Sequence, residues 1–425
     1  MPEMSGDRMG DTRFGMISKK TTQFFILFFM ADHCLWLINS AKQNFVNEIC
    51  WIFILIFLIA QFGISGFKEI RNKRKYYFCY IVLFTVFMGI YSTIQSYILH
   101  GQSVIQGAAP QRFMISGFLM YFVLMKYIQE KEYALDMVKR MFLFLGYLEL
   151  VLYIAQYLLL DHVRFLQISY SNIRLGDIRM NLGSIAVPFV VFYSINNIYI
   201  NRKSSWKDAV SIVAGFFYAF VIAKTRIVLA AYIIALIGGY MIWKRGGKRK
   251  IIVFIALILF VVFLSQTKLF SYLMDGLNNL DMSSQTRQEG RMFYLARIKE
   301  HPIWGCGYIN TNHPGAVAYS GMNNTESGIY WVDLGIYGLT FFFGGIGFFW
   351  FILLYSKMTR MAFCIARKGD LTFWMYMIYS IVICPNGTGF LWYISNTLEL
   401  IMWMCLIESE YKSTLQKQLK GRENG

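Results

Sequence analysis

Residues 45–66 read FVNEICWIFILIFLIAQFGISG, and the next ten residues, 67–76, carry five lysines and arginines. A bilayer with a hydrocarbon core ~30 Å thick is crossed by a helix of roughly 20 mostly apolar residues. An apolar run of this length that ends in a basic segment is typical of a membrane helix whose end faces the cytoplasm. The stretch therefore predicts a membrane-spanning helix.

The same composition extends over the whole chain of 425 residues. Hydrophobic residues make up 56% and charged residues only 15%, whereas a soluble globular chain has roughly 25% charged residues. This balance excludes a soluble globular enzyme. The 6 prolines and the 18% aromatic residues also exclude a disordered or collagen-like chain. We therefore expect an all-α, polytopic integral membrane protein.

Applying the same length and composition test along the chain predicts about 12 transmembrane helices, each with ends uncertain by a few residues. The predicted spans are 22–39, 45–66, 77–98, 111–128, 139–160, 182–200, 207–222, 225–243, 251–272, 328–355, 371–384 and 388–407.

The basic residues give the orientation of these spans. With the N-terminus inside, the segments 1–21, 67–76, 126–140, 201–207, 244–250, 356–370 and 408–425 are cytoplasmic, and each holds three to five lysines and arginines. This positive-inside bias explains the net charge of +17 as topology and attraction to anionic lipid, without a nucleic-acid partner. We expect a multi-pass protein of the plasma membrane, with cytoplasmic tails 1–21 and 408–425 on a membrane domain of 22–407. The first twenty residues contain no cleavable signal peptide pattern.

Two predicted outer loops, 161–181 and 273–325, are long and contain arginines, and long ordered loops are usually functional. Within the second, Thr286 and Glu289 have the spacing of a capping box that opens a helix. Met292, Leu295 and Ala296 would form the apolar face of this short amphipathic helix. The helix should end before Pro302, and residues 304–308 (WGCGY) predict a tight turn that uses glycine.

Several motifs together resemble the superfamily of O-antigen ligases and O-antigen or capsule polymerases. Residues 291–307 (RMFYLARIKEHPIWGCG) resemble its "R…W..A…HP..G.G" block, and residues 324–339 (NTESGIYWVDLGIYGL) resemble the block that opens its next helix. Residues 224–226 (KTR) are similar to its "SR" helix start. Arg174, with 181–183 (NLG) after it, is a looser match to its earlier outer-loop block. The motifs cover about 170–340, and the topology covers the remainder.

The resemblance implies a GT-C-like fold and a polysaccharide polymerase. Such an enzyme moves a growing glycan from undecaprenyl diphosphate to a lipid-linked repeat unit at the outer membrane face, with inversion and without a metal. The substrate would be an undecaprenyl-diphosphate-linked oligosaccharide, and a flippase and a chain-length regulator are partners that the resemblance implies. The lipid diphosphate needs cations that neutralise developing charge. Our first candidate for binding it is Arg226, at a helix start, followed by Arg291 and Arg174, with Arg179 and Arg287 as alternates.

The transfer also needs a base that takes a proton from the acceptor hydroxyl. Glu326 begins the second block, whereas His313 suits the role better chemically, and both remain open as catalytic candidates. If neither serves, Asp177 or a substrate phosphate must be considered. The ligase branch usually carries His-Asn near the position of Asn324 and Thr325, and this departure favours the polymerase branch over a ligase-type single transfer.

The rival class is a transporter, for example a lipid-linked oligosaccharide flippase. In its favour are the acids in predicted spans, Asp32, Glu149, Asp333 and Glu399, since intramembrane acids often form ion sites. Against it, the two halves of the chain show no similarity, and many transporters contain internal repeats. The sequence has no zinc or Asp-x-Asp pattern, and the seven scattered cysteines form no disulfide framework. We expect no metal site and no cofactor.

Overall fold

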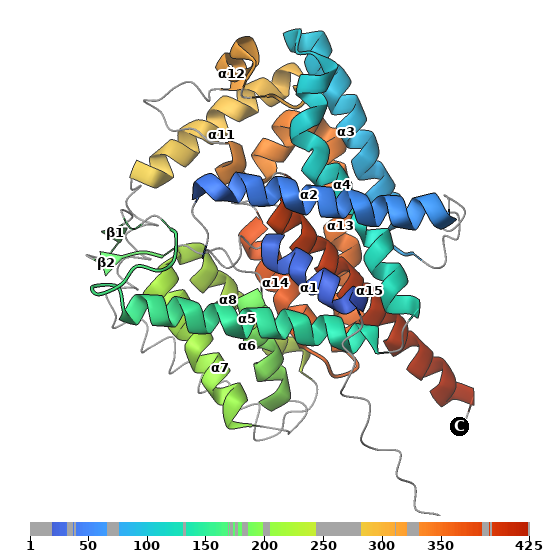
Figure 1. Cartoon of the computed structure of the whole chain (residues 1–425), viewed down its shortest axis with the longest axis vertical. Helices are drawn as coiled ribbons and strands as arrows, with labels where there is room; N and C mark the ends of the chain where they lie inside the picture. Colours follow the sequence, from blue (N-terminus) through green and yellow to red (C-terminus); the bar gives the residue numbers. More distant parts are fainter. Residues whose placement is uncertain are drawn as a thin grey trace, which may run out of the picture.

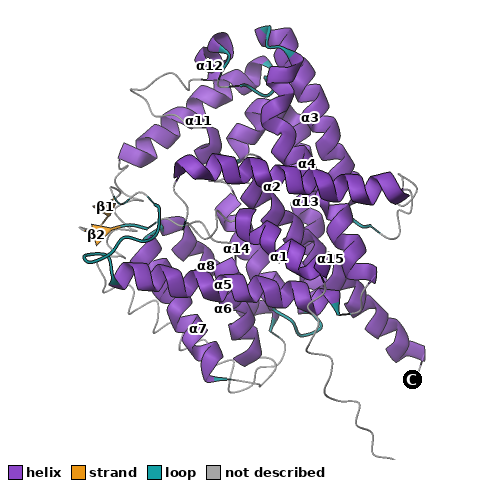
Figure 2. Cartoon of the chain, viewed as in Figure 1, coloured by secondary structure: helices purple, strands orange, loops and turns teal. Residues whose placement is uncertain are grey.

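The part of the chain that the computed structural model describes is almost entirely helical (Figure 1). Described residues are 19–31, 37, 40–65, 76–130, 133–168, 170, 173–174, 177–180, 186–198, 205–243, 282–310, 312–320, 331–384, 391 and 393–423. Strand structure within these ranges is confined to one short antiparallel pair (Figure 2), in which Arg174 is opposite Asp177. The elements, in chain order, are α1 (Lys19–Ala31), α2 (Ser40–Ser65), α3 (Cys79–His100), α4 (Val104–Glu130), α5 (Ala134–Leu158), β1 (Ile173–Arg174), β2 (Asp177–Ile178), α6 (Ala186–Asn196), α7 (Trp206–Phe217), η4 (Tyr218–Ala223), α8 (Arg226–Ile242), α11 (Met282–Glu300), α12 (Pro314–Ser320), η5 (Trp331–Leu334), α13 (Ile336–Ala366), α14 (Thr372–Ile383) and α15 (Ile394–Glu423).

Six described helical segments are long and apolar enough to cross a membrane: Phe45–Phe62, Cys79–His100, Val104–Glu130, Ala134–Leu158, Trp206–Ala223 and Ile336–Ala366. The shorter helices α6, α8 and α14 are apolar as well. These segments identify a multi-pass membrane protein, as the sequence predicts. The number of twelve spans and the orientation of the termini remain predictions, and the predicted span 251–272 lies outside the described residues.

Two helices run well past the predicted membrane boundary. The predicted spans 328–355 and 388–407 correspond to α13 and α15. However, α13 continues to Ala366 and α15 to Glu423. Neither extension contains a proline. Residues 356–366 are rich in methionine and alanine, and residues 408–423 in lysine, leucine and glutamate, all of which are good helix formers. Solvation of charged side chains ends an apolar run without ending the helix, so these two helices continue beyond the predicted spans.

The helix α13 is interrupted at Gly344, whose φ of 62° and ψ of −158° lie outside the helical region. A side chain has no room there, because a Cβ atom on Gly344 would lie 2.2 Å from the carbonyl oxygen of Ile303. Gly305, with φ 70°, faces the same crossing, and its Cβ would lie 2.4 Å from the backbone nitrogen of Gly344. Glycine at both positions is therefore a requirement of the close approach between the two backbones.

The turn over residues 302–307 bonds the backbone groups that this interruption leaves free. The N–H groups of Cys306 and Gly307 donate to the carbonyls of Phe341 and Phe342 at 2.8 and 3.1 Å, and the N–H of Gly345 donates to Pro302 at 2.8 Å. A backbone break inside a membrane domain is tolerated only where such partners exist. The turn that the sequence predicts at 304–308 is confirmed, and it stabilises the bend in α13.

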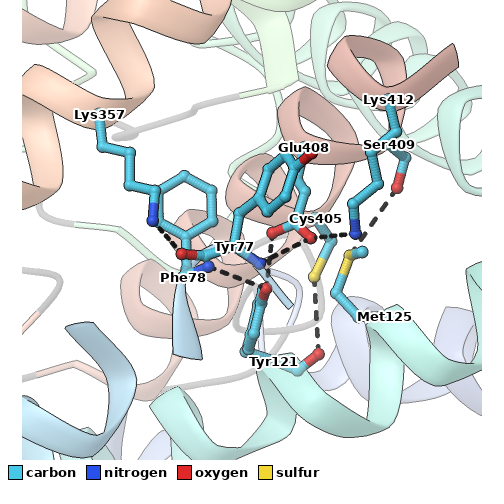
Figure 3. Close-up of polar contacts among 9 residues, drawn as sticks. All are labelled: Tyr77, Phe78, Tyr121, Met125, Lys357, Cys405, Glu408, Ser409 and Lys412. Atoms are coloured by element: carbon cyan, nitrogen blue, oxygen red, sulfur yellow. Dashed lines mark hydrogen bonds and ion pairs between the residues drawn. The ribbon is translucent and has the colours of Figure 1, made fainter. Parts of the chain in front are cut away.

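A buried carboxylate, Glu408 of α15, has contacts with residues of α4 and of the segment just before α3 (Figure 3). Its Oε1 accepts the N–H of Tyr77, just before α3, at 3.0 Å, and its Oε2 accepts the hydroxyl of Tyr121 of α4 at 2.6 Å. Lys412, one turn along α15, forms an ion pair with the same carboxylate at 2.5 Å. Lys357 of α13 donates to the carbonyl of Tyr77. Because a buried charge is costly unless it is paired and hydrogen-bonded, these contacts act together.

We predict that Glu408→Gln lowers the free energy of unfolding by about 2–4 kcal/mol, since it removes the buried anion that pairs with the half-buried Lys412 and accepts hydrogen bonds from Tyr77 and Tyr121. The measurement is thermal or denaturant unfolding of the purified protein in detergent. Glu130→Gln is the matched control, because Glu130 is 41% exposed and pairs with Lys126 at 3.8 Å. An exposed pair contributes less than about 1 kcal/mol, so equal effects of the two variants would contradict this assignment.

The predicted topology can be tested at two exposed described arginines, Arg140 of α5 and Arg287 of α11. Each is replaced by cysteine in a chain whose native cysteines have been removed. A membrane-impermeant maleimide added to intact cells should label the cysteine at 287 and leave the one at 140 unlabelled until the cells are opened. The reverse pattern would refute the orientation, and labelling at both positions would refute the assignment of 140 to the cytoplasmic side.

Candidate functional site

The junction between η4 and α8 is the most unusual backbone segment that the structure describes. The α-helix α7 continues as a π-helix over Tyr218–Ala223, and π-helical turns are rare and concentrated at functional sites. Lys224 then adopts a left-handed conformation with φ 45° and ψ 40°. It is the sole non-glycine residue in the described ranges with a positive φ. A lysine in this region is strained, and such strain persists only where surrounding contacts impose it.

Arg179, which directly follows β2, holds this junction in place. Its Nε donates to the carbonyl of Ala223 at 3.0 Å, and its terminal NH2 group donates to the hydroxyl oxygen of Thr225 at 2.9 Å. The next residue, Met180, donates its N–H to the carbonyl of Ile222 at 3.1 Å. The extended segment 179–180 therefore lies directly along residues 222–225, and the guanidinium group bridges the two sides of Lys224.

Three basic residues belong to this junction: Arg179 bonds to it, and Lys224 and Arg226 lie on either side of Thr225. We call Arg179, Lys224 and Arg226 the junction cluster. The first two are buried, with 7% and 5% of their surface exposed, although arginine and lysine are rarely buried. Beneath them lies a small apolar cluster that includes Met180, Ile222 and Ala223. The low dielectric of such surroundings strengthens the attraction of the cluster for an anion.

Arg226 is the first residue of α8, as the sequence predicts. The residue at the N-cap, Thr225, makes no side-chain cap, since its hydroxyl donates to the carbonyl of Ala223 at 2.9 Å and accepts from Arg179. The positive end of the helix dipole is thus not neutralised by a capping oxygen from Thr225, and this end favours an anion. The basic side chains and the positive end of the helix dipole therefore both favour the binding of an anion.

Arg174, the looser motif match, lies on β1, opposite Asp177 on β2. The strand pair ends just before Arg179, so Arg174 and Arg179 lie close together on the predicted outer loop 161–181.

The helix α11 carries the other two predicted arginines, but it differs from its predicted form. It begins at Met282, so Thr286 lies inside the helix, and the predicted start at the Thr286–Glu289 capping box is wrong. Arg287 and Arg291 are exposed and one turn apart, and the guanidinium carbon of Arg291 lies 5.9 Å from the ring centroid of Tyr337. Both arginines belong to an element other than the junction cluster.

The buried face of α11 is also not the predicted one. Met292, Leu295 and Ala296 are exposed, whereas Gly290 and Tyr294 are buried. The Tyr294 hydroxyl donates to the carbonyl of Ser320 at 2.9 Å, and its ring centroid lies 4.8 Å from that of Phe341. A large aromatic ring with a bonded hydroxyl buries more surface than the predicted stripe, and this packing selects the face.

Of the two candidate bases, His313 lies within the described residues and Glu326 does not. His313 is half-buried just before α12, and its N–H donates to the carbonyl of Asn310 at 3.0 Å. Asn310 is itself fixed, since its N–H donates to the side-chain oxygen of Gln102 at 2.8 Å. The loop that carries His313 is thereby tied to the end of α3. Glu326 lies outside the described residues.

Sequence reasoning overlooked a polar group between α11 and α12. The Tyr319 hydroxyl donates to Glu300 at 2.5 Å, and Arg297 pairs with the same carboxylate at 3.1 Å and covers the Tyr319 ring at 4.2 Å. The hydrogen bond from Tyr319, followed by the contacts with Arg297, lowers the pKa of Glu300. Burial raises the pKa of the neighbouring Cys306 thiol to about 11. The spacing of three residues between Arg297 and Glu300 was the signal in the sequence that could have indicated this pair. Through Tyr319 and Glu300, the group connects α12 to α11 across the loop that carries His313.

Elements from both predicted outer loops lie on the same side of the view in Figure 1. In Figure 1, the β1–β2 pair and the start of α11 lie at the left of the view, and the C-terminal end of α15 lies at the lower right. Within the described residues, no group of three His, Cys, Asp or Glu side chains is placed to hold a metal ion.

Comparison of the chain with protein-family models, curated proteins and solved structures found no match. The family resemblance drawn from the motifs therefore remains a hypothesis.

Lys224 allows backbone strain and charge to be separated. We predict that Lys224→Gly unfolds with a free energy about 1 kcal/mol higher than Lys224→Ala, because alanine keeps the left-handed strain that glycine lacks. Both variants remove the cation, so both should lose the same part of any thermal stabilisation by inorganic pyrophosphate. Equal stability of the two variants would contradict the left-handed conformation, and wild-type stabilisation by pyrophosphate would contradict an anion site.

Proposed function

We propose that the protein is a polysaccharide polymerase of the plasma membrane, with both termini in the cytoplasm. It would transfer a growing glycan from undecaprenyl diphosphate to a lipid-linked repeat unit at the outer face, with inversion and without a metal. The observation that carries this proposal is the junction cluster, in which the Arg179 guanidinium bonds to residues 223 and 225 at the start of α8, beside Lys224 and Arg226 in the chain.

The chemistry fits a leaving group that carries a diphosphate. As the glycosidic bond breaks, negative charge develops on the diphosphate, and fixed cations stabilise it without reorganisation. The guanidinium of Arg179 is held by two hydrogen bonds, so it is already in position before the substrate binds. Arg226 adds a planar fork of donors that suits phosphate oxygens. Because the helices around the cluster are apolar, the prenyl chain of the substrate could remain in the bilayer while its diphosphate binds to the cluster.

The motifs support the same proposal from the sequence. The block 291–307 forms the last part of α11 and the turn that bonds the interrupted backbone of α13. The motif 224–226 forms the strained start of α8. Both motifs therefore coincide with backbone breaks, which a membrane domain tolerates only where they are buried in protein or line a cavity.

The base that activates the acceptor hydroxyl remains open between His313 and Glu326. An imidazole accepts a proton readily at neutral pH, and His313 lies on a loop tied to α3 through Asn310. Glu326 belongs to the second motif block. A flippase and a chain-length regulator would be the natural partners of such an enzyme.

A transporter of lipid-linked oligosaccharides is the second candidate, and the buried acids favour it. Glu149 of α5 is fully buried, and Glu399 of α15 is 9% exposed. Intramembrane carboxylates often bind protons or ions during transport. Such a protein would move the lipid-linked unit across the bilayer without lengthening the glycan, which is a measurable difference.

The decisive experiment uses the purified full chain, reconstituted in vesicles with lipid-linked repeat units. We expect the wild-type protein to lengthen the glycan, and Arg226→Lys to lower the rate about 100-fold, the effect typical of losing one stabilising donor. Arg140→Lys, at an exposed site on α5, is the matched control and should retain the rate. Full activity of Arg226→Lys would remove Arg226 from the site. Movement of the substrate across the bilayer without any polymer would replace the polymerase with the transporter.

A further inference from the structure

A groove on the surface of α13 and α14 has a charged end and an apolar body. Its volume is about 640 Å³, and its apolar walls come from Phe351, Ile352 and Tyr355 of α13 and Trp374 and Ile381 of α14. Polar side chains of α13, namely Ser356, Thr359 and Arg360, line the groove toward one end, with the apolar Phe363 beyond them, and Ile336 lines it as well. None of these residues belongs to the junction cluster.

The walls of the groove are held by specific contacts. The indole N–H of Trp374 donates to the carbonyl of Gly238 of α8 at 3.0 Å, and the rings of Phe363 and Trp374 meet edge to face at 5.5 Å. The rings of Phe351 and Tyr355 lie 4.4 Å apart. Large aromatic side chains fixed in this way give the groove a permanent shape, so that an occupant need not create it.

The length of the groove matches one leaflet of a bilayer. Phe351 and Phe363, which both line it, are twelve residues apart on α13. At ~1.5 Å per residue this separation is about 18 Å, and half of a hydrocarbon core is about 15 Å. The lined stretch of α13, apolar from Phe351 to Tyr355 and polar at Ser356, Thr359 and Arg360, is therefore comparable in length with one leaflet.

The charge at the polar end selects the headgroup. Arg360 lines the groove and is exposed. A second guanidinium, that of Arg367, lies 5.8 Å from the ring centroid of Phe363 at the same end. The hydroxyls of Ser356 and Thr359 add donors beside Arg360. Two cations and two hydroxyls suit a phosphodiester with a net negative charge, and basic pockets between membrane helices bind such headgroups.

We propose that this groove binds one anionic glycerophospholipid, with an acyl chain along the aromatic walls and its phosphate on Arg360. This binding would fix α14 against α13 from the membrane side, and it does not depend on the proposed polymerase activity.

The test uses the tryptophan in the groove. The protein is reconstituted in phosphatidylcholine vesicles that contain a small share of phosphatidylglycerol with brominated acyl chains, which quench nearby tryptophan. The quenching that disappears in Trp374→Phe is the part that reports on the groove. We expect this part to exceed that given by brominated phosphatidylcholine at the same share, and to require about fivefold more phosphatidylglycerol in Arg360→Gln.

Three further arms decide between occupants. Arg140→Gln, a basic residue on α5 outside the groove, should behave as wild type. Ser356→Phe, which fills the groove, should remove the preference for phosphatidylglycerol. Loss of a bound phosphatidylglycerol in native mass spectra of Arg360→Gln gives a second readout that does not depend on Trp374.

Several results would overturn the proposal. Equal quenching by the two lipids would mean ordinary boundary lipid. Displacement of phosphatidylglycerol by an equal share of undecaprenyl phosphate would make the carrier lipid the occupant. Protection of Trp374 from both lipids, together with a dimer in solution, would mean that a second copy of the chain covers the groove.

Discussion

Two interrupted helices must have their free backbone groups bonded inside an apolar domain, and the arrangement of the molecule depends on how this is done. An unbonded amide or carbonyl in the membrane costs several kcal/mol. The break in α13 at Gly344 and the break between η4 and α8 at Lys224 both create such groups. The partners of these groups come from the two predicted outer loops, so each loop is tied to one break.

The two breaks are satisfied by different chemical groups. At Gly344, backbone bonds to backbone, and the turn 302–307 needs only glycine and close approach. At Lys224, the side chain of Arg179 supplies the donors to Ala223 and Thr225. The first break is therefore electrically neutral, whereas the second gathers positive charge. The guanidinium of Arg179 therefore bonds the groups at the second break and also adds positive charge that favours an anion.

The sequence predicts the helical spans well because apolar length is a local property. The predicted spans 77–98 and 225–243 agree closely with α3 (Cys79–His100) and α8 (Arg226–Ile242). The prediction fails where tertiary contacts compete with local patterns. The face of α11 follows the packing of Tyr294 against Phe341, which its own sequence cannot reveal. Similarly, the left-handed Lys224 carries no local signal, since lysine does not favour that conformation.

The site was predictable in its residue types but not in its grouping. Arg226 was recognised from its place at a helix start, and Arg179 only as an alternate. Their association depends on the segment 179–180 lying beside residues 222–225, and these segments are more than forty residues apart in the chain. Such long-range pairing cannot be read from periodicity or spacing in one sequence.

The π-helix η4 has a consequence for which changes of chain length the protein tolerates. Removing or adding one residue within Tyr218–Ala223 would turn every following side chain of α8 by about 100°, the angle between successive residues of a helix. Arg226 would then lie on a different side of α8, and Ala223 would no longer present its carbonyl to the guanidinium of Arg179. Insertions and deletions should thus be absent between Phe217 and Arg226 in functional relatives, however freely their side chains vary.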